Sequence, residues 1–525
     1  MKYILPSLVI VFLSACVAKK FDVQNPIRVE EGERDPLRFR VFNPKIVDGD
    51  PLKVKEYTLK NGLKVFLTVN KENPRIQTQV CVRAGGKNDP SNATGLAHYL
   101  EHLLFKGTSK LGTIDYAKEK IELDKIKQLY EQYRLTGDEF KRDSIYNRID
   151  SISAIASKYA CLSELDQAHS IIGATGTNAY TSNDNTAYIT NIPSNQLENW
   201  LKIESERYRE PVIRLFHTEL EAVYEEKNIS QDNHWRQQYY LLLSELFKKH
   251  NYGLQTTIGT IEHLKNPSLS EIRKYFNKNY VPNNMAICMS GDFNPDSVIN
   301  WVNDKFGAYE RKNNPEFTPG VEEPITEPII KDVFGPETER VYLGYRFPGV
   351  KDRETQVMRI IDMVLSNSQA GLIDLNLNQQ QKVLQASCFP YILSDYSTHI
   401  LYGSPKQGQS LDELKDLLTA EVEKVKNGDF PDWLLPAIIS DMKLSKIKVY
   451  ESNSSRANEF VQSFIQLIEW KDYVKEMEVL ESITKEEVME VAKKYYQYNY
   501  VYVRKNLGED TEVIKVTKPT ITPIE

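Results

Sequence analysis

Short apolar runs in the first half of the chain predict strands. Residues 57–67 form two such runs around Asn61-Gly62, a pair that favours the tight turn of a β-hairpin. Residues 76–82, 186–190 and 285–290 are three further apolar runs of strand length. These segments are the strand candidates of the first half.

Longer segments between these strands have apolar residues at helical spacing. Residues 95–106 fit one helix, and residues 195–250 are mostly helical. Residues 115–168 are dense in charge, with Ile, Leu and Tyr at the same spacing. We expect a long helical hairpin there, with its turn near residues 135–138. A glycine-rich turn follows at residues 173–176.

The order of elements starts again after residues 311–330, which are rich in proline and form the best candidate linker. Beyond it, two segments are strand-like, at 341–347 and 500–503, and one fits a strand hairpin, at 387–402. Four segments fit helices, at 354–366, 410–427, 432–448 and 484–495. Strands mixed with long helices, arranged twice, predict an α+β fold of two similar domains.

These patterns divide the chain into segments. We expect a first domain at residues 51–310, which includes the charged helical segment at about 115–168, and a second domain at residues 331–510. Residues 17–50 mix charge with proline, as is typical of a tether. Residues 511–525 resemble a tail or a linker toward a further part.

The N-terminus has the pattern of an export signal. After Met1-Lys2, residues 3–13 are almost wholly apolar, a run too short for a bilayer span but suited to a signal peptide. The run ends in Leu13-Ser14-Ala15-Cys16, which resembles a bacterial lipobox. We expect residues 1–16 to be a lipoprotein signal and Cys16 to be lipidated. The exported protein would then be anchored to the membrane of the bacterial cell envelope, at the outer membrane or a periplasmic face. The alternative is a plain secretory signal that happens to contain a cysteine.

Composition narrows the class of protein. The 525 residues carry a net charge of −7, and a chain of this length predicts roughly two to four domains. The mild acidity gives no sign of a nucleic-acid groove, so we expect no nucleic acid partner. The cysteines after Cys16 show no CxxC pair. Cys81 and Cys288 lie in strand-like runs, where buried free thiols are expected.

The sharpest feature is His98-Tyr99-Leu100-Glu101-His102. On a helix, His98 and His102 are at positions i and i+4, so both imidazoles share one face and form a ready pair of zinc ligands. Glu101 lies beside the same point, where a carboxylate can take a proton from water without binding the metal. The alternative is two surface histidines on an ordinary helix.

A catalytic zinc site also needs a third protein ligand and an open position for water. The helical segment at residues 219–226 offers four candidates, Glu219, Glu221, Glu225 and Glu226. Glu219 and Glu226 are two helical turns apart and therefore lie on one face. Chemistry alone leaves the choice among the four open, because most acidic residues on helices are merely solvated.

The motif and its surroundings resemble the pitrilysin/insulinase family of zinc peptidases, which has the inverted His-x-x-Glu-His motif. The resemblance covers residues 57–306 strongly and residues 341–502 weakly. Its motifs are Arg83-Ala84-Gly85-Gly86, Gly95-Leu96-Ala97, Phe105-Lys106-Gly107-Thr108, Asn178-Ala179-Tyr180-Thr181, residues 184–188, Asn283-Asn284-Met285 and Gly291-Asp292-Phe293. The resemblance implies two repeated α/β-sandwich domains of the pitrilysin and mitochondrial-processing-peptidase type. Each would be a mainly antiparallel sheet covered by helices.

The resemblance implies roles for the residues of the motif. His98, His102 and a distal glutamate would bind one Zn²⁺ per chain, and Glu101 would be the general base. The implied activity is that of a zinc-dependent endopeptidase. Such an enzyme hydrolyses peptides or unfolded polypeptides that bind in extended form.

The family also has a Glu-x-x-Ala-Val-x-x-Glu stretch, which falls on residues 219–226 of this chain. This alignment makes Glu226 the third ligand and Glu219 a carboxylate that orients the site. Glu225 is the competing assignment. Glu226 lies further from the histidine motif than is usual, and the excess matches the charged segment at 115–168. We therefore expect an insertion beside the active-site cleft, which either shapes access or is a neutral surface decoration.

In this family, Asn178, Ala179 and Tyr180 would lie on a sheet edge that accepts the substrate as an added strand. An exposed edge offers unpaired N–H and C=O groups that bind an extended peptide with little regard for its sequence. Without the resemblance, Asn178 would be taken as a turn residue after Gly176.

Two alternatives to a self-sufficient enzyme stay open. Family members form a chamber from two halves, and the second half supplies an arginine and a tyrosine that hold the substrate. The hairpin at residues 387–402 has Tyr391, Tyr396 and Tyr402 but no arginine. The chain would then be one catalytic half, completed by a partner chain, a second copy of itself or a missing C-terminal portion. The other alternative is a non-catalytic subunit for peptide binding or assembly in the cell envelope.

Overall fold

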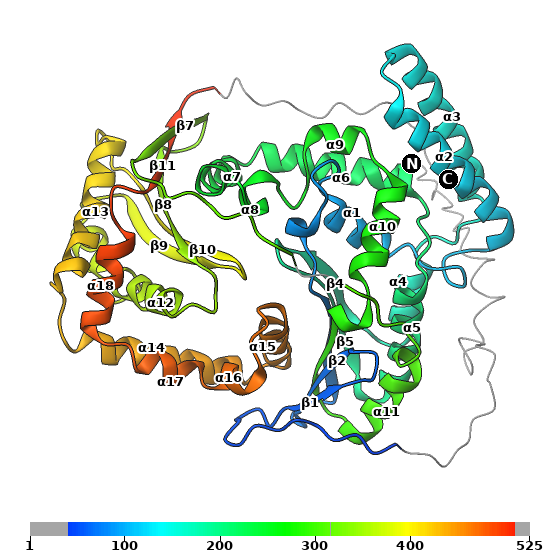
Figure 1. Cartoon of the computed structure of the whole chain (residues 1–525), viewed down its shortest axis with the longest axis horizontal. Coiled ribbons are helices and arrows are strands. Elements are labelled where there is room, and N and C mark those ends of the chain that lie inside the picture. Colours follow the sequence, from blue (N-terminus) through cyan, green and yellow to red (C-terminus); the bar gives the residue numbers. More distant parts are fainter. Residues whose placement is uncertain (1–39, 315–316, 510–525) are drawn as a thin grey trace, which may run out of the picture.

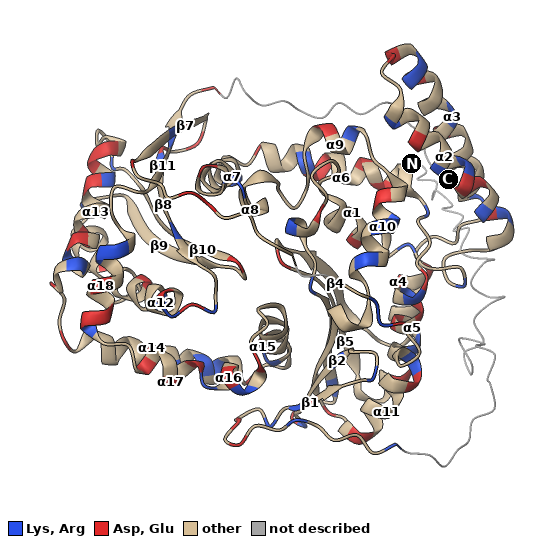
Figure 2. Cartoon of the chain, in the orientation of Figure 1, with Lys and Arg blue, Asp and Glu red and all other residues tan. Residues whose placement is uncertain are grey.

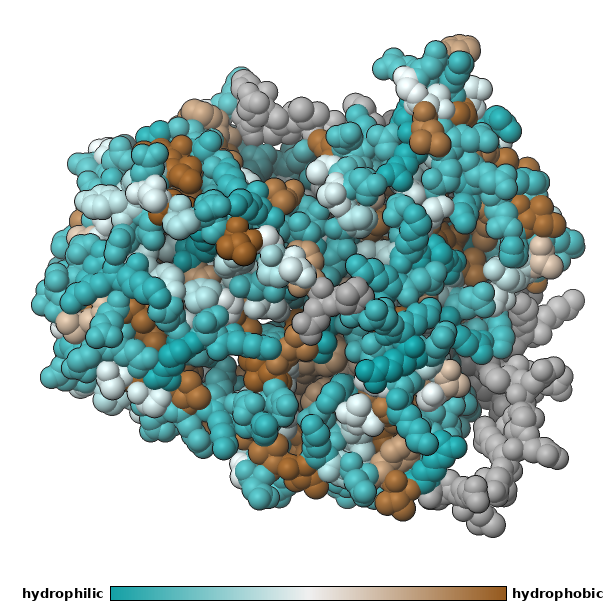
Figure 3. Space-filling view, in the orientation of Figure 1, coloured by the Kyte–Doolittle hydropathy of each residue, from teal (hydrophilic) through white to brown (hydrophobic). Residues whose placement is uncertain are grey.

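The computed structural model describes residues 40–314 and 317–509. They form two lobes: the first is built on strands β1 to β6 and the second on strands β7 to β11 (Figure 1). Most of the face in Figure 3 is hydrophilic, with apolar side chains mainly in the middle, where the lobes meet, and at the lower edge. The predicted signal peptide, Cys16 and the predicted tail at 511–525 lie outside the described residues.

The first sheet has six strands in the order β1-β2-β6-β3-β5-β4. The β2–β6 pair is parallel and the other four pairs are antiparallel. This places β4 at one edge and β6 in the interior. The strands are β1 (Lys55–Thr58), β2 (Lys64–Val69), β3 (Arg75–Val82), β4 (Thr175–Thr181), β5 (Thr186–Pro193) and β6 (Met285–Gly291).

The hairpin predicted from Asn61-Gly62 is confirmed, since β1 and β2 pair antiparallel on either side of it. Gly62 has φ of 93°, a conformation that L side chains rarely adopt. A Cβ at this position would lie 2.7 Å from Cβ of Asn283. Both observations explain why glycine is needed in this turn.

Alternate residues of the first sheet pack against different helices, because successive side chains of a strand point to opposite faces. Val65, Val80 and Ile287 belong to the large core beneath the helices of the first lobe. Phe66 and Cys81 belong to a second core on the other face. Besides the helical hairpin described next, the helices of the large core are α1 (Leu96–Leu103), α4 (Glu164–Ile171), α5 (Leu197–Arg209), α6 (Phe216–Gln231), α9 (Ile261–Lys265), α10 (Leu269–Asn279) and α11 (Pro295–Phe306).

The predicted helical hairpin is confirmed as α2 (Tyr116–Leu135) and α3 (Glu139–Ser157). The hairpin projects from the first lobe, and Lys, Arg, Asp and Glu occur at many positions along both of its helices (Figures 1 and 2). Its base packs on α6, where the hydroxyl of Tyr130 lies 2.7 Å from Nδ1 of His217. The hairpin therefore supports the helix that carries the candidate glutamate ligands.

The second sheet has five strands in the order β7-β11-β8-β10-β9, with only the β7–β11 pair parallel. The strands are β7 (Ile329–Gly335), β8 (Arg340–Pro348), β9 (Gln385–Ile392), β10 (Tyr396–Ser404) and β11 (Val501–Leu507). The helices α12 (Arg353–Leu365), α13 (Leu411–Asn427), α14 (Leu434–Val449), α17 (Glu476–Glu481) and α18 (Lys485–Tyr495) cover it. The mixed α/β fold with two helix-covered sheets is as expected.

Each sheet also packs against one helix that comes from the other half of the sequence. Helix α7 (His234–Leu246), from the first half of the sequence, packs on the second sheet, and α15 (Asn453–Ile465), from the second half, packs on the first (Figure 1). Leu242 and Phe464 are among the buried side chains of these contacts. The two lobes are therefore joined by hydrophobic cores as well as by the chain.

The thiols of Cys81 and Cys288 are free and buried, as predicted. Burial raises the pKa of both thiols, which keeps them protonated. Within residues 40–314 and 317–509, we find no helix whose length and apolar character would let it cross a bilayer.

Candidate metal centre

Helix α1 presents the histidine motif toward a cavity because its opposite face is apolar. Leu96, Leu100 and Leu103 are buried in the first core. The side chain of Asp89 caps the N-terminus of this helix. Its Oδ2 accepts from the backbone N–H of Gly95 at 2.7 Å, and its Oδ1 accepts from the backbone N–H of Ala97 at 2.9 Å. These bonds satisfy backbone donors that a helix N-terminus leaves free.

Two imidazole nitrogens and one carboxylate converge beside α1. Nε2 of His98 lies 3.3 Å from Nε2 of His102. Oε2 of Glu226, on α6, lies 3.3 Å from Nε2 of His98, and Oε1 of Glu226 lies 3.7 Å from Nε2 of His102. The structure thus brings Glu226 of α6 to the two histidines of α1, which lie more than 100 positions earlier in the sequence.

This cluster fits a zinc ion. The three ligand atoms lie within 4.8 Å of one another, and two histidines with one glutamate form the usual donor set of a catalytic zinc site. The side chain of Glu226 is 43% exposed, and the cluster lines a cavity of about 800 Å³. The cluster is therefore open to a water molecule or a substrate from the side of the cavity. Of the four candidate glutamates, Glu226 is the member of this cluster, and Glu225 is not.

Glu219 contacts His102 through Nδ1, the ring nitrogen that is not part of the cluster. Oε1 of its carboxylate lies 2.8 Å from Nδ1 of His102, and Oε2 lies 2.5 Å from Nζ of Lys106. Burial would raise the pKa of Glu219, but these two partners lower it below its ordinary value, so the group is a carboxylate. A carboxylate only accepts, so Nδ1 of His102 carries the proton and Nε2 keeps its lone pair for a metal.

The two histidines differ in their surroundings. Burial and the neighbouring imidazole of His102 lower the pKa of His98 to about 4, so its ring is neutral at physiological pH. Burial also opposes a charge on His102. The hydrogen bond to Glu219 and the charges of Glu226, Glu219 and Glu101 outweigh it, and the pKa of His102 is raised. Protons therefore compete with a metal ion for His102 up to a higher pH than for His98.

Glu101 lies in the same cavity with one oxygen fixed. The hydroxyl of Thr181, the last residue of β4, donates to Oε2 of Glu101 at 2.6 Å. Burial raises the pKa of Glu101, although the bond from Thr181 and the charge of His102 act in the opposite direction. A carboxylate with a raised pKa beside a metal site is suited to accept and return a proton.

The edge strand β4 lines the cavity next to the cluster. Asn178, Ala179 and Tyr180 all contribute to its lining. Asn178 lies inside the strand and pairs with Ile189 of β5, so it is not a turn residue. In the first sheet β4 has β5 as its only neighbour, which leaves its other edge open to an added strand.

Sequence reasoning missed three residues of this cavity. Arg236 and Tyr240 lie one turn apart on α7 and line the cavity, and Thr181 holds Glu101. The i, i+4 spacing of Arg236 and Tyr240 carries no signal of its own. Their position becomes visible only once α7 is placed beside the first lobe.

A second group with metal-binding side chains lies in the second lobe. Asp362, Cys388 and His399 bring ligand atoms within 4.8 Å of one another. However, Nε2 of His399 lies 3.0 Å from Oδ1 of Asp362, and Nδ1 lies 2.6 Å from the hydroxyl of Tyr496. The thiol of Cys388 donates to the backbone oxygen of Asp362. These groups satisfy one another, as in a buried structural network.

Two sequence models of protein families match the chain. Residues 64–125 match the model described as insulinase (peptidase family M16), and this range contains the histidine motif. Residues 268–442 match the model described as peptidase M16 inactive domain. The second match begins in the first lobe and includes strands β7 to β10.

Individual proteins are similar over most of the chain. A zinc protease, PqqE of Helicobacter pylori, is 24% identical over 430 residues, which are 79% of this chain and 84% of that protein. The crystal structure of a protease from Helicobacter pylori has a TM-score of 0.72 at 22% identity, covering 86% of this chain and 99% of that one. The periplasmic protease PqqL of Escherichia coli has a TM-score of 0.66 at 15% identity, covering 88% of this chain and 48% of that one.

Proposed function

Because the chain belongs to the pitrilysin/insulinase family of peptidases, we propose that it is a zinc-dependent endopeptidase. Its substrates would be peptides or unfolded polypeptides bound in extended form. The observation that carries this proposal is the convergence of His98, His102 and Glu226 in the cavity that also holds Glu101 and the free edge of β4.

His98, His102 and Glu226 would hold one Zn²⁺ per chain, and Glu219 would orient His102. When bound, a zinc ion supplies Lewis acidity, which makes a water more acidic and a peptide carbonyl more electrophilic. The donor set of two neutral imidazoles and one carboxylate suits this metal. Glu226 is preferred over Glu225 because its carboxylate reaches both imidazoles.

Glu101 would be the general base. Its carboxylate would take a proton from the attacking water, hold it, and pass it to the leaving amine. Thr181 donates to one oxygen of Glu101 and so leaves the other oxygen for this transfer. The raised pKa of Glu101 brings its proton affinity closer to the range in which a group can both accept a proton from water and donate it to an amine.

The free edge of β4 would bind the substrate. Backbone groups of Asn178, Ala179 and Tyr180 would form hydrogen bonds with an extended peptide, much as β5 does on the other side. Such bonds read the backbone and not the side chains. We therefore expect loose sequence specificity and a requirement for extended substrates.

One observation favours the alternative that the chain is a catalytic half. The periplasmic protease PqqL has about twice the length of the part that this chain matches. Against it, the Helicobacter pylori protease is matched over almost its whole length. Similarity to a periplasmic protease supports export to the cell envelope, and lipidation of Cys16 would add a membrane anchor.

Elemental analysis of the purified chain and turnover of a quenched, unstructured peptide test the proposal together. We expect one zinc per chain, activity that a chelator removes and added zinc restores, and a loss of about 10²- to 10⁴-fold in Glu101→Gln with zinc retained. Zinc without turnover would favour the catalytic half, which needs a second half. Absence of zinc, or full activity of Glu101→Gln, would overturn the proposal.

A further inference from the structure

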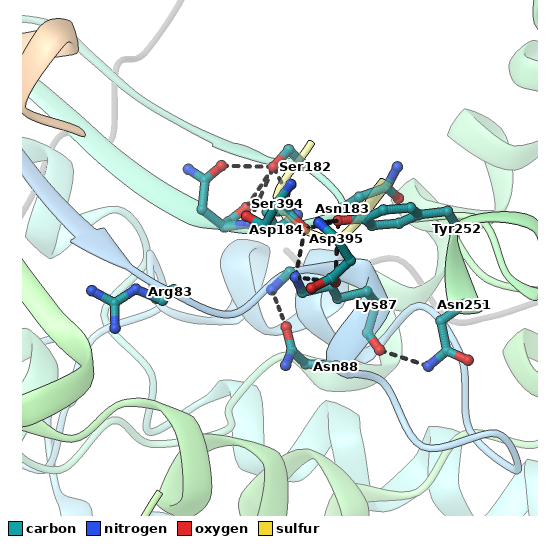
Figure 4. Close-up of polar contacts among 12 residues, drawn as sticks. Arg83, Lys87, Asn88, Ser182, Asn183, Asp184, Asn251, Tyr252, Ser394 and Asp395 are labelled. Carbon is teal, nitrogen blue, oxygen red and sulfur yellow. Dashed lines mark hydrogen bonds and ion pairs between the residues drawn. The ribbon is translucent and has the colours of Figure 1, made fainter. Parts of the chain in front are cut away.

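A buried lysine joins the two lobes in the segment that leads into helix α1. Lys87 lies in the short turn between β3 and α1, and its side chain is 9% exposed. Its Nζ lies 2.9 Å from Oδ1 of Asp184, in the turn between β4 and β5, and 2.8 Å from Oδ2 of Asp395, in the hairpin between β9 and β10 (Figure 4). One cation thus pairs with a carboxylate from each lobe.

Neighbouring groups complete this network. The hydroxyl of Tyr252, in the short helix α8 (Asn251–Leu254), donates to Oδ1 of Asp184 at 2.7 Å, and the backbone N–H of Ser394 donates to Oδ2 of Asp184 at 2.9 Å (Figure 4). Nε2 of His250 lies 3.3 Å from Oδ2 of Asp395. The ammonium group of Lys87 is therefore shared by two carboxylates, each of which has further hydrogen-bond partners in a largely buried contact.

The turn of Lys87 is bonded to the β4–β5 turn through the backbone as well. The N–H of Gly86 donates to the backbone oxygen of Ser182 at 2.9 Å, and that of Lys87 donates to the oxygen of Asn183 at 3.0 Å. A Cβ at Gly85 would lie 2.2 Å from the oxygen of Ser182. Glycine is required here because the two turns touch.

Each of these two turns leads directly to a part of the site. Two residues after Lys87, Asp89 caps the N-terminus of α1, the helix of His98, Glu101 and His102. On the other side, the β4–β5 turn follows Thr181, which donates to Glu101. The joined turns therefore set the position of the metal-binding helix relative to the edge strand β4.

We propose that Lys87 and Asp395 are positioning residues, through which the second lobe fixes α1 against β4. The inference rests on the proposed function of the site. The second lobe, which contributes none of the candidate metal ligands or the base, would then act on the reaction through one carboxylate. Catalytic groups need to be held within about 0.5 Å of their productive geometry, and a displacement near 1 Å lowers rates about 100-fold.

The test compares variants of the full chain. Lys87→Met and Asp395→Asn are expected to lower kcat about 10- to 100-fold. The zinc content should stay at one per chain because the candidate metal ligands remain, and KM should change little because the β4 edge remains. Lys87→Arg should recover part of kcat, since it restores the charge. The double variant Lys87→Met/Asp395→Asn should be no worse than Lys87→Met, as expected of residues that act as a unit.

A matched control lies at another contact between the lobes. Oδ1 of Asn453 accepts from Nδ2 of Asn70 at 3.0 Å and from the hydroxyl of Ser290 at 2.9 Å, away from both turns. Asn453→Ala should therefore leave kcat unchanged. Amide hydrogen exchange gives a readout besides activity: residues 96–103 and 175–181 should exchange faster in Lys87→Met and as in wild type in Asn453→Ala.

Several outcomes would overturn the inference. One is wild-type kcat and exchange in Lys87→Met or Asp395→Asn. Another is an equal loss of kcat in Asn453→Ala, which would indicate only general loosening of the interface. If wild type binds no zinc, the proposed function fails instead, and if it binds zinc but hydrolyses no peptide, the chain needs a second half. The positioning of α1 against β4 is then judged by hydrogen exchange alone.

Discussion

Nδ1 of His102 lies 2.8 Å from the carboxylate of Glu219, one turn of α6 from the start of that helix. His98 has no such support, since its buried Nδ1 lacks a hydrogen-bond partner within the described part of the chain. The two imidazoles of the motif are therefore held in different ways. His102 is fixed by a carboxylate, and His98 by the packing of α1.

Replacing Glu219 should weaken zinc binding without abolishing it. Glu219→Gln removes the negative charge that keeps the proton on Nδ1 of His102, and a loss of 10- to 100-fold in zinc affinity is typical for such a change. Competition with a chelating dye measures this affinity. Glu221→Gln, on the same helix, is the control and should bind zinc as wild type does. Equal affinities of the two variants would contradict the role of Glu219.

The assignment of the third ligand can be tested with adjacent residues. Glu226→Gln should lose bound zinc during dialysis, because its carboxylate is the only one in the cluster. Glu225→Gln, one position away, should keep one zinc per chain. Elemental analysis of both dialysed proteins decides between them. The reverse result would assign the ligand to Glu225.

Thr181 should affect the rate but not the metal. Thr181→Val keeps the shape of the side chain and removes the hydrogen bond to Glu101, so kcat is expected to fall about tenfold with zinc content unchanged. Thr177→Val, on the same strand and in the same cavity, should leave kcat close to wild type. A loss of activity in Thr177→Val as large as that in Thr181→Val would show that the edge strand as a whole is sensitive.

Stability should depend on pH through His217, a buried residue in the first turn of α6 that contacts Tyr130 of the helical hairpin. Burial lowers the pKa of His217, against the opposing charge of Asp150. Below the ordinary histidine value of about 6.5, the unfolded chain binds a proton that the folded chain does not, so stability falls as pH falls. The melting temperature of wild type should therefore drop more between pH 7.5 and 5 than that of His217→Gln. Parallel curves would contradict this expectation.

Much of the fold could be predicted from local patterns. The hairpin at Asn61-Gly62, the helical hairpin α2–α3 and most strands follow from spacing and turn residues. Strand β7 was missed because it is a half-exposed edge strand next to the proline-rich segment. The exchange of α7 and α15 between the lobes was missed because an amphipathic pattern shows which face is buried, and not against which sheet.

For the candidate site too, local sequence patterns predicted some residues and missed the contacts between distant segments. His98, Glu101 and His102 could be predicted because their spacing on one helix places two imidazoles and a carboxylate side by side, as a metal site with a base requires. The choice of Glu226 needed the family alignment, since four glutamates share its helix. Lys87 and Asp395 gave no signal. Their ion pair joins turns that are distant in the sequence, and no local pattern encodes such a contact.

The interior position of β6 affects when the first sheet can form during synthesis of the chain. β6 lies between β2 and β3, although it follows both by most of the length of the first lobe. Until Met285–Gly291 has left the ribosome, β2 and β3 have no strand to join them, and the sheet that backs α1 cannot close. A growing chain would therefore carry its candidate metal ligands unassembled. We expect the hydrolytic activity proposed here to begin only after β6 has joined the sheet.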